Sequence, residues 1–313
     1  MNIMINNHCN LNCEYCFANN IIDQDKQNMS IEDFKKCILF LKEDKKSSIS
    51  LIGGEPTLHP KFSEILEIIK KVDFIDSIFI FSNGLFGDQI RKCFIDFSLV
   101  KKISFLINYN HPNILGKKDE LLKENLRVLS KNEINIILGI NLYKKNQDFE
   151  YLIEACNKYA IKNVRWALAV PNNNINSKID VRAHFISYIN DIFQLLEICL
   201  KNNIKPQVDC NNIPLCFLSD TELRRMTYLG NSDISICSPV IDILPNLDVI
   251  RCFAFPDYKV KLNEFRTSDE IYNHFEKNID LNAEKRFLVS ECENCISYQL
   301  RGKSCACLAY KMN

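Results

Sequence analysis

Short apolar runs alternate along the chain with longer stretches in which apolar residues recur every three or four positions. The short runs predict β-strands, and the longer stretches predict amphipathic helices. Strands are predicted at residues 2–6, 48–52, 77–82, 103–108, 135–141 and 164–169. Helices are predicted at residues 30–45, 61–72, 88–97, 117–132 and 146–159, with Ser30 as the first N-cap. This alternation predicts the α/β class, with βα units on a parallel sheet.

The number of units limits the architecture. Six strand–helix units fit into about 170 residues, whereas a closed barrel needs eight. The pattern alone leaves a partial barrel and an open doubly wound sheet as alternatives. A further helix is predicted at residues 180–203. Beyond residue 205 the periodicity weakens, and eight of the fifteen cysteines follow. We therefore expect two domains, 1–205 and 206–313.

Composition argues against several classes of protein. The 39 basic and 39 acidic side chains cancel, so the charge signature of nucleic-acid or anionic-membrane binding is missing. No run of about 18 apolar residues predicts a membrane span, and the N-terminal residues do not form a secretory signal. We expect a cytoplasmic protein. In a reducing compartment fifteen cysteines indicate metal or cluster ligands, catalytic thiols or core residues rather than disulfides.

A first cysteine motif lies close to the N-terminus. Cys9, Cys13 and Cys16 have C-x3-C-x2-C spacing. Three thiolates on one loop can bind a single [4Fe–4S] cluster, which needs four ligands, so one iron stays open. Zinc is the alternative, but His8 directly precedes Cys9 and is poorly placed as a fourth ligand.

A second motif follows the predicted strand at 48–52. Its residues are Gly53, Gly54, Glu55 and Pro56. Two glycines permit close approach of the backbone to a ligand, and a carboxylate suits an ammonium group. A turn without function is the alternative for this motif taken alone.

Together the two motifs resemble those of the radical S-adenosylmethionine (SAM) superfamily, including Tyr15 as the aromatic residue before the third cysteine. The resemblance implies a partial (β/α)6 TIM-like barrel. It also implies that SAM chelates the open iron and meets Gly53, Gly54 and Glu55 through its amino group. The reduced cluster would then cleave SAM to a 5′-deoxyadenosyl radical that takes a hydrogen atom from the substrate. An electron donor such as flavodoxin or ferredoxin would supply the electron.

Polar residues at later strand ends are further candidates for SAM binding, since barrel active sites form at strand C-termini. Strand-end turns and solvated residues are the alternative for each of them. The set comprises Ser82, Asn83, Asn108, Asn141 and Arg165. Ser82 and Asn83 resemble the T-N-G ending of the family's third strand. Asn108 stands where the fourth strand often ends in S-x-D.

The C-terminal cysteines suggest additional metal sites. They are Cys210, Cys216, Cys237, Cys252, Cys292, Cys295, Cys305 and Cys307. Eight thiolates suit two further [4Fe–4S] clusters, whereas the last four also fit a zinc ribbon. Spacing alone does not decide between these alternatives.

The resemblance favours clusters, because Cys237 and Cys252 followed by the later pair look like a SPASM or twitch domain. This small auxiliary domain would hold one or two clusters. The chain departs from the SPASM pattern at Leu247, where glycine is expected, and in the spacing of the last four cysteines.

Two groups of cysteines receive other roles. Cys210 and Cys216 fit the SPASM pattern least well, so they are candidate hydrogen-atom donors to a substrate radical. Four others lie in predicted helices among apolar neighbours and are expected to be inert core residues. These are Cys37, Cys93, Cys156 and Cys199.

Three functions compete. The SPASM-like region favours modification of a ribosomally made peptide by a crosslink, a thioether or an epimerisation. Any leader peptide would be held by the barrel, the C-terminal domain or a separate recognition protein. The second function is a radical SAM dehydrogenase acting on a small molecule or a protein residue. Within this second function, maturation of a sulfatase is less favoured, because Phe253 follows Cys252 where sulfatase-maturing relatives have aspartate. The third is a scaffold that binds iron–sulfur clusters or zinc without catalysis.

Overall fold

The computed structural model describes residues 1–22, 25–169, 181–209, 214–229, 240–284 and 290–295 of the 313-residue chain. One sheet organises these residues, with the strand order β10-β9-β8-β1-β2-β3-β4-β5-β6-β7. The strands from β1 to β7 pair in parallel, each with the next in the sequence. Their bounds are β1 (Asn2–Met4), β2 (Ser48–Ile52), β3 (Ser77–Ser82), β4 (Lys102–Asn108), β5 (Asn135–Leu142), β6 (Asn163–Leu168) and β7 (Lys205–Val208).

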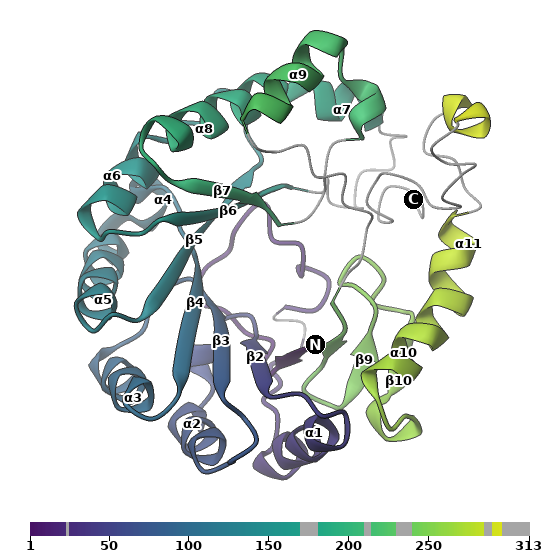
Figure 1. Ribbon diagram of the computed structural model, residues 1–313. Helices are drawn as coiled ribbons and strands as arrows, with labels where there is room; N and C mark the ends of the chain where they lie inside the picture. Colours follow the sequence, from purple (N-terminus) through teal and green to yellow (C-terminus); the bar gives the residue numbers. More distant parts are fainter. Residues whose placement is uncertain (23–24, 170–180, 210–213, 230–239, 285–289, 296–313) are drawn as a thin grey trace.

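Helices cover the outer face of this curved sheet, as Figure 1 shows. They are α1 (Ile31–Glu43), α2 (Phe62–Lys70), α3 (Asp88–Ser98), α4 (Pro112–Leu115), α5 (Asp119–Lys131), α6 (Glu150–Lys158), α7 (Val181–Ser187) and α8 (Ile189–Lys201). Ser30 caps α1 as the sequence predicts, because its side chain accepts the Asp33 amide at 3.0 Å. The predicted α/β class and partial barrel are confirmed.

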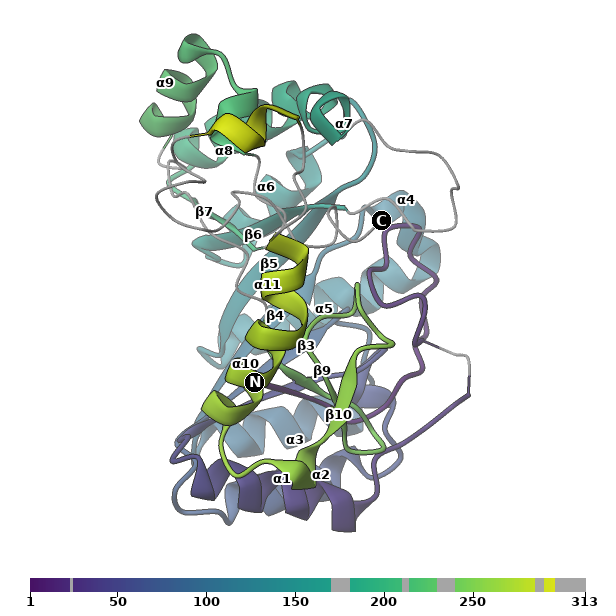
Figure 2. The same cartoon turned by 90° about the vertical axis from the view of Figure 1, so that its right-hand side faces the viewer.

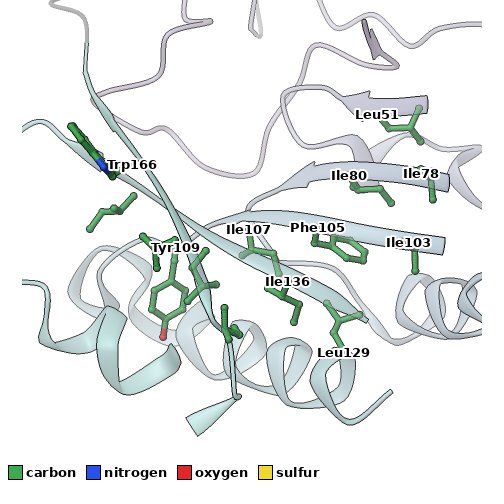
Figure 3. Packing of buried hydrophobic residues seen from close by; sticks show 14 of the residues in the cluster. Leu51, Ile78, Ile80, Ile103, Phe105, Ile107, Tyr109, Leu129, Ile136 and Trp166 are labelled. Atoms are coloured by element: carbon green, nitrogen blue, oxygen red, sulfur yellow. The ribbon is translucent and has the colours of Figure 1, made fainter. Parts of the chain in front are cut away.

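The main core lies between the sheet and the helices. Every second residue of a strand points to one face, so β3 contributes Ile78 and Ile80 while β4 contributes Ile103, Phe105 and Ile107. Figure 3 shows these side chains together with Leu129 of α5, which lies beside Ile136 of β5. Cys37, Cys156 and Cys199 are buried in this core, and Cys93 packs against it, as expected for inert thiols.

The predicted helix at 180–203 is divided in two. Tyr188 separates α7 from α8 and lies outside helical geometry at φ −106° and ψ 0°. Its hydroxyl donates to the carbonyl of Tyr143 at 3.0 Å. This tertiary contact is invisible to a periodicity argument, which sees one continuous amphipathic stretch.

Residues beyond 205 extend the sheet rather than stand apart from it. β7 begins at Lys205, and the strands β8 (Asp242–Ile243), β9 (Asp248–Ile250) and β10 (Lys259–Lys261) continue the opposite end. β8 pairs in parallel with β1, while β9 and β10 are antiparallel additions. The boundary predicted at 205/206 stays a prediction, but the hydrogen-bonded sheet crosses it.

The remaining helices flank the two ends of the sheet. They are α9 (Asp220–Tyr228), α10 (Ser268–Phe275) and α11 (Leu281–Glu284). Figures 1 and 2 show α10 and α11 beside β9 and β10. Arg251 after β9 fixes them there through an ion pair with Asp280 at 2.8 Å. Among the described residues, no helix has the length and apolar character that a bilayer crossing requires.

Candidate functional site

The first cysteine motif lies on the long segment that joins β1 to α1. Figure 1 shows this segment, in purple, in the opening around which the strands fan out. Cys9, Cys13 and Cys16 are all half-buried. The amide of Cys16 donates to the carbonyl of Cys13 at 3.1 Å, which makes a tight turn between them. The three thiols therefore lie at the C-terminal ends of the parallel strands, where folds of this kind form their active sites.

The two glycines after β2 allow the cysteine segment to pack against the sheet. A Cβ on Gly54 would stand 2.3 Å from the carbonyl oxygen of His8, and one on Gly53 would stand 2.2 Å from Oδ1 of Asn6. Backbone bonds run through the same contact, since the Glu55 amide donates to His8 at 2.9 Å. The close approach anticipated for a ligand is thus used by the protein's own backbone.

Glu55 joins the ends of β2 and β3. Its carboxylate is fully buried and accepts hydrogen bonds from the Thr57 amide and hydroxyl at 3.3 and 2.7 Å. It also accepts from the Ser82 hydroxyl at 2.9 Å and the Asn83 amide at 2.7 Å. Burial raises the pKa of Glu55, and these donors oppose that rise. The predicted contact with an ammonium group stays a prediction; the described bonds give the carboxylate a structural task.

Asn83 links β3 to the cysteine segment. Its Nδ2 donates to Oδ1 of Asn10 at 2.7 Å and lies 3.8 Å from the sulfur of Cys9. Lys118 holds the same segment from the other side, because its ammonium donates to the Asn10 carbonyl at 2.9 Å. Asn10, between Cys9 and Cys13, is therefore held by side chains from the end of β3 and from the turn before α5.

Four polar side chains form a hydrogen-bonded row beside Cys13. Asn141 of β5 donates to Asn108 of β4 at 3.1 Å, and Asn108 donates to the Tyr15 hydroxyl at 2.8 Å. Tyr15 in turn donates to Oδ1 of Asn110 at 2.5 Å. We call Asn141, Asn108, Tyr15 and Asn110 the Tyr15 row. Three of these residues were predicted from the sequence, and the fold brings them together.

Asn110 is the member that the sequence analysis missed. It lies two residues after Asn108, so the period of an extended chain puts both side chains on one face. The Asn108-Tyr109-Asn110 spacing was thus a usable signal. Asn110 is 4% exposed, and Tyr109 between them turns into the opposite, apolar core.

The cysteine thiols are costly to ionise without a metal. Burial raises the pKa of Cys9 to about 11, and Glu55, Cys13 and Cys16 add negative charge that pushes in the same direction. Burial also raises the pKa of Cys13, while Tyr15 and Asn110 hydrogen bonds lower it. A bound metal reverses this balance, because it supplies the positive charge that the thiolates lack.

The donor set fits an iron–sulfur cluster. In the described part of the chain, no three His, Cys, Asp or Glu side chains converge as a single metal ion requires. The three thiols of this segment still lie near enough to affect the ionisation of Cys9. A cluster is wider than one ion and is held by thiolates, so three separated thiols on one loop suit it.

Arg165 lies on the concave face of the sheet. Its guanidinium is ion-paired with Asp209, which follows β7, and lies 5.9 Å from the ring centre of Phe81. The side chain is partly exposed, so it faces the space enclosed by the strands. Its predicted contact with SAM stays a prediction.

Cys252 lies next to the first motif although the two are far apart in sequence. It follows β9 and is half-buried. The neighbouring Phe253 packs edge-to-face on Phe17, which follows Cys16, with 5.1 Å between ring centres. The second cysteine region therefore contacts the first through this aromatic pair.

The other C-terminal cysteines are described only in part. Cys292 and Cys295 are half-buried in the short turn Ser290–Asn294 and directly after it. Cys216 is exposed in the 3₁₀ turn Leu215–Phe217. Four predicted residues lie outside the described residues: Cys210, Cys237, Cys305 and Cys307. The auxiliary clusters, the zinc ribbon and the hydrogen-donor role all stay predictions.

Comparisons with known proteins agree with the family resemblance of the two motifs. The family model of the radical SAM superfamily matches residues 3–165. The GTP 3′,8-cyclase of Chlorobaculum tepidum is 31% identical over 97 residues, which are 31% of this chain and 29% of the cyclase. The alignment thus spans less than a third of that relative. An uncharacterized protein of Methanocaldococcus jannaschii is 24% identical over 277 residues, covering 83% of this chain and 89% of that protein.

Solved structures with a similar fold are also known. Streptococcus suis SuiB bound to S-adenosylmethionine superposes with a TM-score of 0.64 at 17% identity, over 94% of this chain and 69% of SuiB. SuiB bound to its precursor peptide SuiA gives a TM-score of 0.60 at 16% identity, with 94% and 68% covered. At these identities the likeness establishes the fold.

Proposed function

The chain belongs to the radical SAM superfamily, and from this premise we propose that it is an enzyme that modifies a ribosomally made peptide. A [4Fe–4S] cluster and SAM are the cofactors of this family and of this chain. When bound, they supply the reductive cleavage of SAM that yields the 5′-deoxyadenosyl radical. The rest of the task falls to the protein, which must bind, orient and shield the reacting groups.

We assign the cluster to Cys9, Cys13 and Cys16. The support is that all three are half-buried thiols on one segment, which Asn83 and Lys118 hold through Asn10. Fixed ligands keep one iron without a protein thiolate, and this iron is the position for SAM. Asn108 and Asn141 at the adjacent strand ends are the amides that we assign to the polar parts of SAM.

The observation that carries the peptide assignment is the open sheet. β7 and β10 are its two ends, and these ends do not pair with each other in the described structure. Phe81, Ile137 and Arg165 on its concave face are partly exposed. A face of this kind suits an extended chain. The fold shared with SuiB, which has been solved with its precursor peptide, supports the same choice.

A second candidate is a small-molecule enzyme that acts on a nucleotide. The local identity to GTP 3′,8-cyclase favours it. That identity covers less than a third of either protein, whereas the SuiB likeness covers 94% of this chain. We therefore rank the peptide first.

The first experiment tests the reaction class. The protein is purified anaerobically, reconstituted with iron and sulfide, and incubated with SAM and dithionite. We expect iron and sulfide in the ratio of a [4Fe–4S] cluster and release of 5′-deoxyadenosine. A protein that retains zinc, or that binds iron but leaves SAM intact, contradicts the assignment and favours a scaffold.

The second experiment tests the substrate. Short peptides encoded beside the gene are added to the loaded enzyme, and GTP is added in a parallel reaction. Loss of a hydrogen pair from the peptide indicates a crosslink or thioether, while uptake of solvent deuterium indicates epimerisation. Turnover of GTP with every peptide unchanged would move the assignment to the second candidate.

Two protein partners belong to the same proposal. We propose a flavodoxin or ferredoxin as the physiological electron donor in place of dithionite. Where the peptide carries a leader, the barrel, the C-terminal region or a separate recognition protein holds it. Pull-down of the peptide with and without its leader segment distinguishes these arrangements.

We further propose an auxiliary cluster that includes Cys252. The Phe17–Phe253 contact supports it, because it brings Cys252 beside the first cysteine segment. Iron content in the Cys252→Ala variant, compared with the wild-type protein, tests this assignment.

A further inference from the structure

The Tyr15 row has a single direction of hydrogen bonding. Each member donates to the next, from Asn141 to Asn108, from Asn108 to Tyr15, and from Tyr15 to Asn110. The amide oxygens of Asn108 and Asn110 are both used as acceptors in this row. Chains of aligned hydrogen bonds polarise one another, so each bond strengthens the following one. The donor at the end of the row is the amide nitrogen of Asn110.

That final donor is buried and makes no well-formed hydrogen bond among the described residues. Asn110 is 4% exposed, so leaving this N–H without an acceptor is unfavourable. The side chains of Tyr15 and Asn110 both act to lower the pKa of Cys13, which indicates that they stand near its sulfur. A neutral thiol is a weak acceptor, whereas a metal-bound thiolate carries the negative charge that an N–H donor requires.

We propose that Asn110 and Tyr15 are positioning residues that direct a hydrogen bond onto the Cys13 thiolate and thereby raise the reduction potential of the cluster. This inference rests on the proposed ligand role of Cys13. The physical reason is charge. Reduction adds an electron to the cluster, and a donor aimed at a ligand sulfur stabilises the more negative state. The other members of the row act through Asn110 by holding its amide group in one orientation.

Surrounding contacts keep the row rigid. The Tyr15 ring packs on Tyr143 with 4.8 Å between ring centres. Asn108 and Asn141 stand on neighbouring strands of the sheet, whose pairing is fixed by backbone bonds. The Asn110 amide is therefore oriented before any cofactor binds, and the protein does not have to reorganise when the cluster gains an electron.

The test is a redox titration followed by electron paramagnetic resonance, on the reconstituted full-length protein without SAM or substrate. The variants are Asn110→Leu, which removes the donor, and Tyr15→Phe, which removes only the hydroxyl that orients it. At the wild-type midpoint we expect the reduced-to-oxidised ratio to fall about tenfold in Asn110→Leu, which corresponds to about 59 mV for one electron. A smaller fall, about threefold, is expected in Tyr15→Phe.

A matched control removes a hydroxyl elsewhere. Tyr151 is also buried, and its hydroxyl donates to the Tyr109 carbonyl at 3.3 Å, outside the Tyr15 row. Tyr151→Phe should leave the potential unchanged. Tyr15→Phe keeps the ring and its packing, so it decides the question alone if Asn110→Leu does not assemble a cluster.

The outcomes separate the inference from the function on which it rests. A wild-type protein that cannot hold a [4Fe–4S] cluster contradicts the ligand assignment itself. Variants that carry full iron and sulfide but keep the wild-type potential overturn the inference alone. A shift of the same size in Tyr151→Phe overturns it as well, because the effect would then be general.

Discussion

The two cysteine regions that meet at the Phe17–Phe253 contact are held in different ways. The first, around Cys9, Cys13 and Cys16, receives side chains from β3, β4 and the turn before α5, and Glu55 clamps the strand ends beneath it. The second, around Cys252, is attached through β8 to β10 and the Arg251–Asp280 ion pair. The first site is built by a buried polar network, and the second by an extension of the sheet.

This difference separates two roles. A polar network fixes sulfur positions and their hydrogen bonds, which is what a site for precise chemistry requires. A sheet extension fixes where a region lies while leaving the immediate surroundings of its thiols less constrained. We therefore expect changes in the first region to affect catalysis directly. Changes in the second should affect it through an auxiliary cofactor or the substrate.

Removing one thiol from each region gives the largest expected difference. Cys13→Ala should lose the iron of the SAM-binding cluster and lower SAM cleavage by more than ~100-fold, since even indirect ligand support is worth 10–100-fold at metal sites. Cys252→Ala should keep dithionite-driven release of 5′-deoxyadenosine. Iron analysis and chromatography of the products measure both. Cys156→Ala, a buried thiol of α6, is the control and should retain iron and activity.

The clamp of the first region is tested by Glu55→Gln. The Thr57 and Ser82 hydroxyls can rotate, but the amide of Asn83 must still find an acceptor, and glutamine offers one oxygen instead of two. We expect a loss of about 3 kcal/mol in the free energy of unfolding. Urea denaturation measures it. Glu120→Gln changes an 85% exposed side chain of α5 and should stay within about 0.5 kcal/mol of the wild-type protein. Equal effects of the two substitutions would contradict the clamp.

The junction of the two regions should respond to pH. Asp242 of β8 is buried against β1, where Asn2 donates to it at 2.8 Å. Burial raises the pKa of this carboxyl to about 7 in the folded protein. The folded state therefore holds the proton more tightly than the unfolded state, and this group's contribution to stability falls as pH rises from about 4 to about 7.

Asp242→Asn removes that dependence. Asparagine keeps the acceptor for Asn2 and carries no charge to bury, so above pH 7 we expect the variant to be more stable by on the order of 2 kcal/mol. At pH 3, below the pKa of the unfolded state, the two proteins should be nearly equal. Urea denaturation at both values measures the difference. A variant that is less stable than the wild-type protein at pH 8 speaks against a buried charge at this position.

The contact between the regions has the smallest expected effect. A double-mutant cycle of Phe17→Leu and Phe253→Leu should give a coupling energy of about 1 kcal/mol, as for other aromatic pairs. Phe17 is 66% exposed, which limits its share of burial energy. Phe17→Leu combined with Phe265→Leu, whose ring packs on His274 instead, should be additive. Additivity in both cycles would show that the two regions are not coupled through this pair.

The sequence predicted the parts of the site that depend on local spacing. C-x3-C-x2-C needs only one loop, and the strand–helix period needs only hydrophobic and polar positions. The strands at 48–52 and 77–82 agree with β2 and β3 in full. The predicted partial barrel follows from the number of such units. These features can be predicted from the sequence because each is determined by residues close together in the chain.

The sequence did not reveal other features, because they depend on contacts between residues that are far apart in the chain. The motif does not reveal that the Glu55 carboxylate accepts hydrogen bonds from Thr57, Ser82 and Asn83. Asn110 gained its importance from Tyr15, which is 95 residues away. The weak periodicity from residue 205 onward concealed four short strands, since two to four residues carry no measurable period.

By itself, the sequence determined the α/β class, the cysteine segment after the first strand and the two motifs that carry the family resemblance. Only the tertiary structure decided that Gly53 and Gly54 make room for His8 and Asn6, that Phe253 packs on Phe17, and that the Tyr15 row ends at Asn110. The reason is physical: spacing along the chain sets local geometry, whereas burial and hydrogen-bond direction depend on which strands become neighbours.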